Sequence, residues 1–142
     1  MTDIIVIFSE DMRVVAYLSF SENNIVTKWL DPVSEAKYQE IFENIKTVDN
    51  VFLAIADTNY GALAQAKVSP DSELYPKAVL QFLKSQGILC ALVYPEALDL
   101  LKSLNDAPAD LRESFIPEII NSKRQDFEKI SELTHKFLEA AF

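Results

Sequence analysis

The sequence predicts an α/β fold built on a mixed sheet, and three observations lead to that prediction. Three stretches near the N-terminus have the β-branched and aromatic composition of strands, and short polar turns separate them. Helical and strand patterns then alternate up to about residue 104, which indicates parallel pairing in that part of the chain. The residues that follow are helical and amphipathic. We therefore expect an antiparallel meander, an α-β-α-β-α order and a C-terminal helical extension.

The N-terminal part is expected to contribute three antiparallel strands. Residues 3–8 form a short apolar run, and residues 13–20 follow it after a turn at 10–11. Apolar and polar residues alternate along residues 25–30, which indicates a third strand. The polar turn at 21–24 precedes it. Strands joined by such short turns pair with their neighbours, so a meander is expected.

A capped helix follows the meander. Asp31 is a helix-capping residue, and Pro32 occupies the first helical position, where proline is favoured. Apolar residues then recur at helical spacing, at Tyr38, Ile41, Phe42 and Ile45. Glu35 shares their face in the first turn, so its carboxylate is expected to point toward the sheet.

The second half of this domain alternates strands and helices. Residues 51–56 are a continuous apolar run, which is typical of a strand covered on both faces, and Asp57 ends it. A helix is expected from Ser72 to near Gly87, and a second buried strand at 88–93. We predict that strand 51–56 is central and that strand 88–93 runs parallel to it.

The C-terminal residues form an amphipathic helical extension. A short helix is expected at 110–116, broken near Pro117. A longer helix carries an apolar stripe made of Phe127, Ile130, Leu133, Phe137 and Leu138. Such a stripe must be buried, either on its own domain, which we favour, or against a partner helix. The predicted division is therefore an α/β domain at 1–106 and a helical extension at 107–142, packed on it.

Composition restricts the possible functions. The formal net charge of −9 opposes non-specific binding to phosphate, and the presence of only two glycines argues against a glycine-rich phosphate loop. The lone Cys90 lies in an apolar run, which favours a buried, inert thiol. The sequence contains neither a signal-like apolar region nor a run of roughly 18 apolar residues that would span a bilayer. A cytoplasmic protein without a membrane partner is expected.

The segment after strand 51–56 carries a family resemblance, and it reads Asp57-Thr58-Asn59-Tyr60-Gly61-Ala62-Leu63. This segment resembles the ribonuclease H family, in which a strand-end aspartate is followed by a small hydroxyl residue, a polar residue and an aromatic residue. Other acids of that family end the first strand, open the first helix and open the last helix. The corresponding residues here are Glu10, Glu35, Asp57 and Asp99, with Glu96 as a rival for the last position.

The resemblance covers residues 4–104 and implies a ribonuclease H-like mixed sheet of five strands. It also implies that Glu10, Glu35, Asp57 and Asp99 are catalytic residues and metal ligands. Clustered carboxylates repel one another, and a hard cation such as Mg²⁺ or Mn²⁺ relieves that repulsion. Two such ions can activate water for phosphodiester hydrolysis. The implied activity is a metal-dependent nuclease that cuts RNA in a hybrid or a related nucleic acid.

Departures from the family favour a second hypothesis on the same fold. The family's first acid is normally an aspartate followed by glycine, whereas this chain reads Glu10-Asp11. The family's histidine before the last acid is missing, since the only histidine is His135. The alternative is a non-catalytic acidic protein-interaction or inhibitor module, which binds a protein partner through its acidic surface or its C-terminal helices. A third interpretation, a receiver-like domain with acids at 10, 11 and 57, requires residues 12–23 to be a helix.

Overall fold

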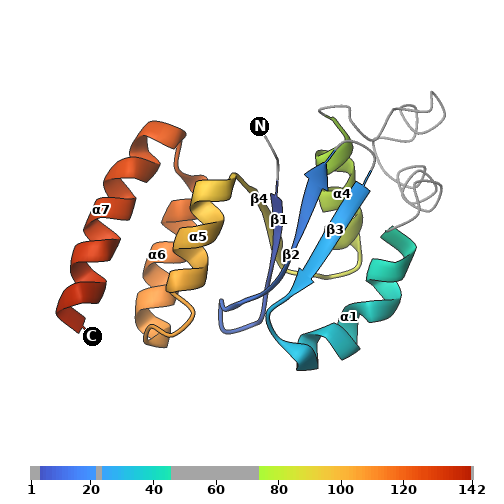
Figure 1. The fold of residues 1–142 in the computed structure, drawn as a ribbon, viewed down its shortest axis with the longest axis horizontal. Coiled ribbons are helices and arrows are strands. Elements are labelled where there is room, and N and C mark those ends of the chain that lie inside the picture. Colours follow the sequence, from blue (N-terminus) through green and yellow to red (C-terminus); the bar gives the residue numbers. More distant parts are fainter. Residues whose placement is uncertain (1–3, 22–23, 46–73, 142) are drawn as a thin grey trace.

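A computed structural model describes residues 4–21, 24–45 and 74–141, and Figure 1 shows their arrangement in three layers. A sheet lies in the middle, and helices cover both of its faces. The predicted strand 51–56, Asp57 and the beginning of the helix expected from Ser72 lie outside these residues. The strands are β1 (Ile4–Phe8), β2 (Val14–Ser21), β3 (Asn24–Trp29) and β4 (Cys90–Val93). The helices are α1 (Pro32–Ile45), α4 (Leu74–Ser85), α5 (Pro95–Ser103), α6 (Ala109–Asn121) and α7 (Arg124–Ala141).

The described sheet has four strands in the order β3-β2-β1-β4, and each neighbouring pair is antiparallel. The predicted meander of the first three strands is thereby confirmed. The receiver-like interpretation is wrong, because it requires a helix where β2 lies. The prediction that strand 51–56 is central is wrong, because β2 and β4 pair directly with β1 on its two sides and no place is left between the described strands. The parallel pairing of segment 51–56 with strand 88–93 and the fifth strand stay predictions.

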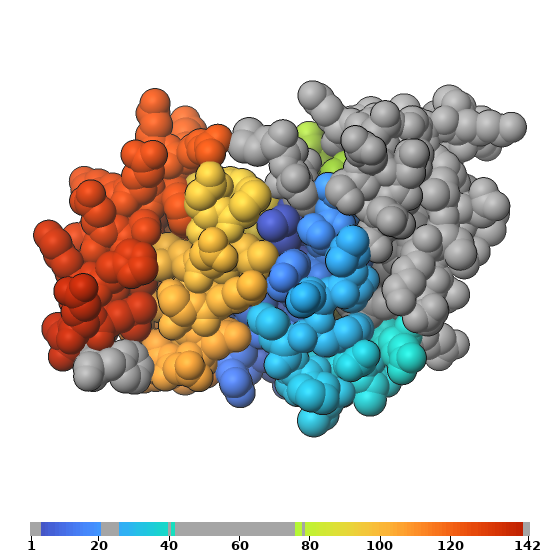
Figure 2. Space-filling view, in the orientation of Figure 1, coloured from blue at the N-terminus to red at the C-terminus, as the bar shows by residue number. Residues whose placement is uncertain are grey.

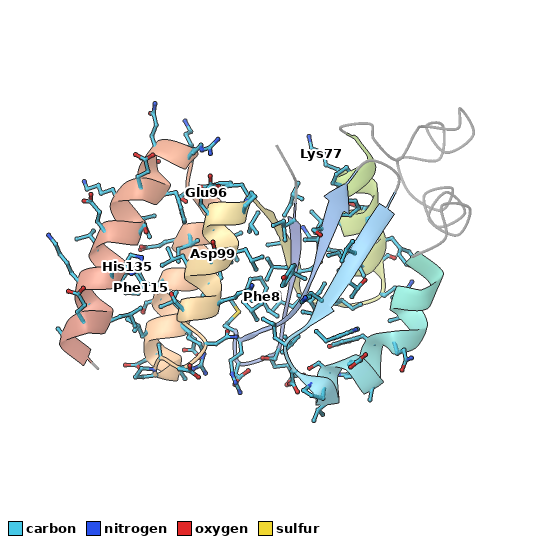
Figure 3. All side chains as sticks on the ribbon, in the orientation of Figure 1. Phe8, Lys77, Glu96, Asp99, Phe115 and His135 are labelled. Carbon is cyan, nitrogen blue, oxygen red and sulfur yellow. The ribbon has the colours of Figure 1, made fainter. Side chains whose placement is uncertain are left out.

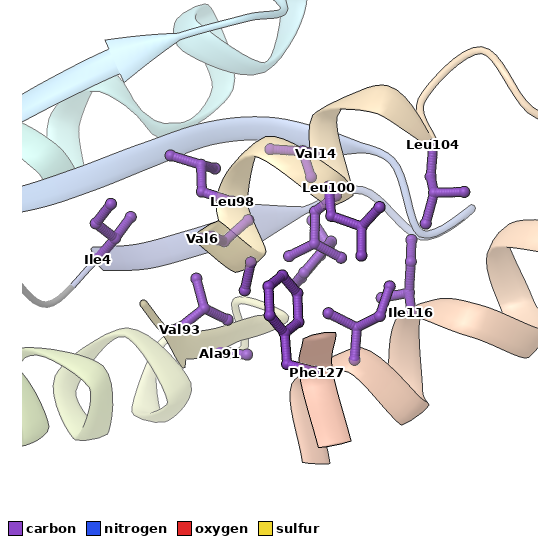
Figure 4. Packing of buried hydrophobic residues seen from close by; sticks show 14 of the residues in the cluster. Ile4, Val6, Val14, Ala91, Val93, Leu98, Leu100, Leu104, Ile116 and Phe127 are labelled. Carbon is purple, nitrogen blue, oxygen red and sulfur yellow. The ribbon is translucent and has the colours of Figure 1, made fainter. Parts of the chain in front are cut away.

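Both faces of β1 are buried, which explains its continuous apolar sequence. Ile5 and Ile7 belong to a core cluster with residues of α4, and α1 side chains pack against that cluster. The alternate residues of β1 belong to a second cluster, shared with β4, α5, α6 and α7. The members of this second cluster labelled in Figure 4 are Ile4, Val6, Val14, Ala91, Val93, Leu98, Leu100, Leu104, Ile116 and Phe127.

Local signals set the beginning of α1 and the end of α4. The backbone N–H of Val33 donates to Oδ1 of Asp31 at 3.0 Å, so Asp31 caps α1 as predicted. Gly87 has a φ of 75°, a left-handed conformation that glycine adopts without strain. The N–H of Gly87 donates to the carbonyl of Lys84 and the N–H of Ile88 to that of Leu83, which is the Schellman pattern of a helix end.

Pro117 does not break its helix, and this prediction was wrong. Helix α6 continues from Ala109 to Asn121 with the proline inside it. Ile116 and Ile119, on either side of the proline, are 0% and 1% exposed and belong to the core. Burying both side chains against the sheet layer compensates for the backbone hydrogen bond that proline removes.

The apolar stripe of α7 divides into two parts. Phe127 is buried in the core, and Ile130 and Leu138 pack against that core. Leu133 and Phe137, which we expected to be buried, are 54% and 49% exposed. The core that α7 joins contains residues from both sides of the predicted boundary at 106/107. Among the described helices, none is long and apolar enough to cross a membrane.

Candidate functional site

The turn between β1 and β2 borders a polar hollow of about 380 Å³. Residues of the turn form one side, and the first two turns of α1 form the other; the lining residues are Ser9, Glu10, Asp11, Ser34, Lys37 and Tyr38. The hydroxyl of Ser9 donates to the carboxylate of Asp11 and lowers the pKa of that carboxyl group, and the positive charge of Arg112 contributes in the same direction.

Two polar side chains from the α5–α6 region hold this turn in place. The buried Arg112 donates from Nε to the carbonyl of Asp11 at 3.2 Å, and its Nη2 lies 3.5 Å from the Asp11 carboxylate. The side chain of Asn105 pairs with the backbone N–H and carbonyl of Val14, at 2.8 and 3.0 Å. These contacts fix the turn that carries Glu10 against the helical layer.

A larger groove, of about 490 Å³, lies between α5 and α7. Glu96, Asp99 and Ser103 contribute to it from α5, at the spacing of one helix face. Glu128, Ser131, Glu132 and His135 line it from α7, and Leu100 and Phe127 complete it. Figure 3 labels Glu96 and Asp99 on α5 and His135 on the neighbouring α7.

The lining of the α5–α7 groove is acidic. Among the described residues that line it, four are carboxylates and none is lysine or arginine. Arg124, just outside the groove, makes an exposed ion pair with Glu96 at 2.8 Å. Sequence reasoning did not identify the contribution of α7. The signal was the spacing of Glu128, Glu132 and His135, which places them on one side of the apolar stripe.

The structure does not bring the predicted acids together. Glu10 lines the hollow at the β1–β2 turn, and Glu35 is half-buried in the first turn of α1. Asp99 and its rival Glu96 line the α5–α7 groove, and no residue in the described part of the chain lines both this groove and that hollow. Helices α1 and α5 pack on opposite faces of the sheet, which explains the separation. Asp57 lies outside the described residues.

The described residues do not provide a metal site. Within 4–21, 24–45 and 74–141, there is no group of three or more histidine, cysteine, aspartate or glutamate side chains that could hold a metal ion. The residues present in this part of the chain therefore do not fit the Mg²⁺ or Mn²⁺ centre that the resemblance implies. What they do provide is a groove with a high density of carboxylates on two packed helices.

Comparisons of this chain with models of protein families, with curated proteins and with solved structures gave no match.

Proposed function

We propose that this protein is a non-catalytic acidic interaction module whose binding site is the α5–α7 groove. Its partner is a protein surface that carries lysine or arginine beside apolar side chains. The observation that supports this proposal is the convergence of Glu96, Asp99, Glu128 and Glu132 on one groove, in which Leu100 and Phe127 supply apolar surface.

The charge of the groove defines the chemistry of the partner. Neighbouring carboxylates repel one another, and a cationic side chain placed between them relieves that repulsion. The net charge of −9 also attracts a basic partner over a longer range and increases its rate of association. A nucleic acid, with its anionic backbone, is disfavoured at the same surface.

A labelled peptide of alternating lysine and leucine tests the groove, with binding followed by fluorescence anisotropy. The variant Glu128→Lys/Glu132→Lys should weaken binding by about tenfold or more, because it reverses two charges of the groove. The control Glu113→Lys/Glu118→Lys makes the same change of charge on exposed positions of α6, outside the groove. Equal losses in both variants would show that only net charge matters and would exclude the groove as the site.

The metal-dependent nuclease is the second candidate. It is favoured by the strand-strand-strand-helix order and by the hollow that Glu10 shares with the beginning of α1. On this hypothesis the sheet has a fifth strand, and Glu10, Glu35 and Asp57 bind Mg²⁺ or Mn²⁺ without Asp99, which lines the α5–α7 groove. Calorimetric titration with Mn²⁺ should then show binding that Asp57→Asn abolishes, together with hydrolysis of an RNA–DNA hybrid. Absence of Mn²⁺ binding to the unchanged protein would exclude this candidate.

A further inference from the structure

The face of the sheet that packs against α5 is partly exposed along β3. Val26 and Lys28 point to this face, since Lys28 lies opposite Tyr17 in the strand register and Tyr17 packs on the core beneath α5. Leu30 follows directly after the end of β3. Val26 is 47% exposed and Leu30 is 42% exposed, so two large apolar side chains meet solvent beside a lysine.

A second lysine borders the same surface. The Nζ atom of Lys102, on α5, lies 4.7 Å from the centre of the Tyr17 ring. We call Tyr17, Val26, Lys28, Leu30 and Lys102 the β3 patch. It combines positive charge with exposed apolar area, in a chain whose net charge is −9. This is the chemistry that the proposed function assigns to the partner of the α5–α7 groove.

We propose that the partner of the groove is a second copy of this chain, which docks its β3 patch there. The inference rests on the proposed function and identifies the partner of the same groove. Charge complementarity supports it, because the two lysines of the patch face a groove that contains four carboxylates. The exposed side chains of Val26 and Leu30 supply apolar area that such a contact removes from water.

The arrangement of the two surfaces permits a closed dimer. In Figure 2, α5 lies between α7 and the strands β2 and β3 on one face of the molecule. A twofold axis in the plane of that face, close to α5, places the groove of each copy on the β3 patch of the other. The contact between groove and patch then forms twice, and neither of these two surfaces remains free to extend the assembly.

The net charge of each copy opposes this association but does not prevent it. Charges separated by more than about 10 Å are largely screened at an ionic strength near 0.1 M. The contacts between groove and patch lie within that range, so the local attraction is retained while most of the repulsion between the two copies is screened.

Charge reversal tests the proposal through the molar mass measured by multi-angle light scattering over a series of protein concentrations. The unchanged chain should approach twice its mass of 16.1 kDa. Lys28→Glu cancels the net positive charge of the patch, in which Lys102 remains, and Glu128→Lys/Glu132→Lys cancels the net negative charge of the groove, in which Glu96 and Asp99 remain. Each variant alone should remain monomeric. An equimolar mixture of the two should dimerise again, since one contact of the mixed dimer joins an unchanged groove to an unchanged patch, and the other pairs the two reversed charges of the groove with the reversed charge of the patch.

Controls separate this interface from other causes of association. Lys77→Glu makes the same change of charge as Lys28→Glu, but at an exposed position of α4 in the opposite helical layer. It should leave the dimer intact. Circular dichroism melting of each variant verifies that it is folded. A monomeric unchanged chain, a dimer insensitive to both reversals, or a mixture that stays monomeric would each overturn the proposal. If the chain is monomeric and its groove still binds the lysine–leucine peptide, the proposed function stands and only self-association fails.

Discussion

At the scale of single residues, Arg112 connects the β1–β2 turn to the helical layer. It is 8% exposed, and it donates to the backbone carbonyls of both Asp11 and Ala107. A buried guanidinium that donates to two carbonyls fixes the position of the chain around it. If the chain moved, these hydrogen bonds would be lost, and no water could replace them at a buried position. Arg124 is the contrasting case, since its ion pair with Glu96 is more than half exposed.

Arg112→Met should therefore lower the free energy of unfolding by about 2 kcal/mol, because it removes two hydrogen bonds from a buried position. Arg124→Met should lower it by less than about 1 kcal/mol, as expected for an exposed ion pair. Urea unfolding followed by circular dichroism measures both changes. Similar losses in the two variants would show that the contacts of Arg112 do not stabilise the turn.

Cys90 provides a test of burial through pH. Desolvation raises the pKa of its thiol to about 11. In the unfolded chain a thiol ionises near pH 8.5, so the unfolded state is favoured as the pH rises from that value toward the folded pKa. Between about pH 8.5 and pH 11 the unchanged protein should lose of the order of 2 kcal/mol more stability than Cys90→Ala. Urea unfolding at a series of pH values measures the free energy of unfolding of both proteins. If this free energy changed equally with pH in the two, the thiol would be accessible in the folded state.

At the scale of elements, α6 shows how packing overrides a local signal. Proline inside a helix removes one backbone hydrogen bond and is about 3 kcal/mol less favourable than alanine there. The helix nevertheless continues through Pro117, because the core holds the turns before and after it. Helix α6 therefore contains a destabilising proline whose cost is offset by the packing of the helix in the core.

Pro117→Ala should consequently raise the stability of the protein. The expected gain in the free energy of unfolding is about 1 kcal/mol or more, since the restored hydrogen bond is partly offset by the greater freedom of the unfolded chain. Thermal melting by calorimetry measures the change. Glu118→Ala, at the next exposed position of α6, is the control and should change stability by no more than about 0.5 kcal/mol. A less stable proline variant would show that α6 depends on its present geometry.

At the scale of the whole molecule, one core joins the two predicted segments. Leu104 and Ala107 lie in the same cluster as β1, and so do Leu111, Ile116, Ile119 and Phe127 from α6 and α7. Arg112 and Asn105 add polar contacts between the β1–β2 turn and the helical layer. The C-terminal helices thus complete the core of the α/β part of the chain.

A chain that ends after Asn105 should fail to form a stable fold, because it leaves one face of β1 and α5 without their apolar cover. We expect strong binding of a hydrophobic dye and no sharp thermal transition. The matched control is the full chain with Leu133→Ala/Phe137→Ala, which changes side chains that are about half exposed and should keep a sharp transition. A truncated chain that melts cooperatively would contradict this role of the C-terminal helices.

The sequence by itself determined the elements whose signals are local. Strands β1 to β3, the cap at Asp31 and the helix end at Gly87 depend on residues within a few positions of one another, and each was predicted. The apolar residues of β1 indicated a strand, and burial of both its faces became clear only from the packing. Local hydrogen bonding and side-chain alternation act over short stretches of chain, so they can be recognised without coordinates.

Only the tertiary structure decided which distant residues meet. The family resemblance grouped Asp99 with Glu10, whereas the packing of α5 and α7 places Asp99 with Glu128 and Glu132. The period of α7 reveals an apolar side and an acidic side, but it does not say which helix the acidic side faces. The exposure of Leu133 and the continuation of α6 through Pro117 could not be predicted for the same reason. Both depend on the core that forms around these residues. Contacts between distant segments are set by how the layers pack, and that packing is a property of the whole chain.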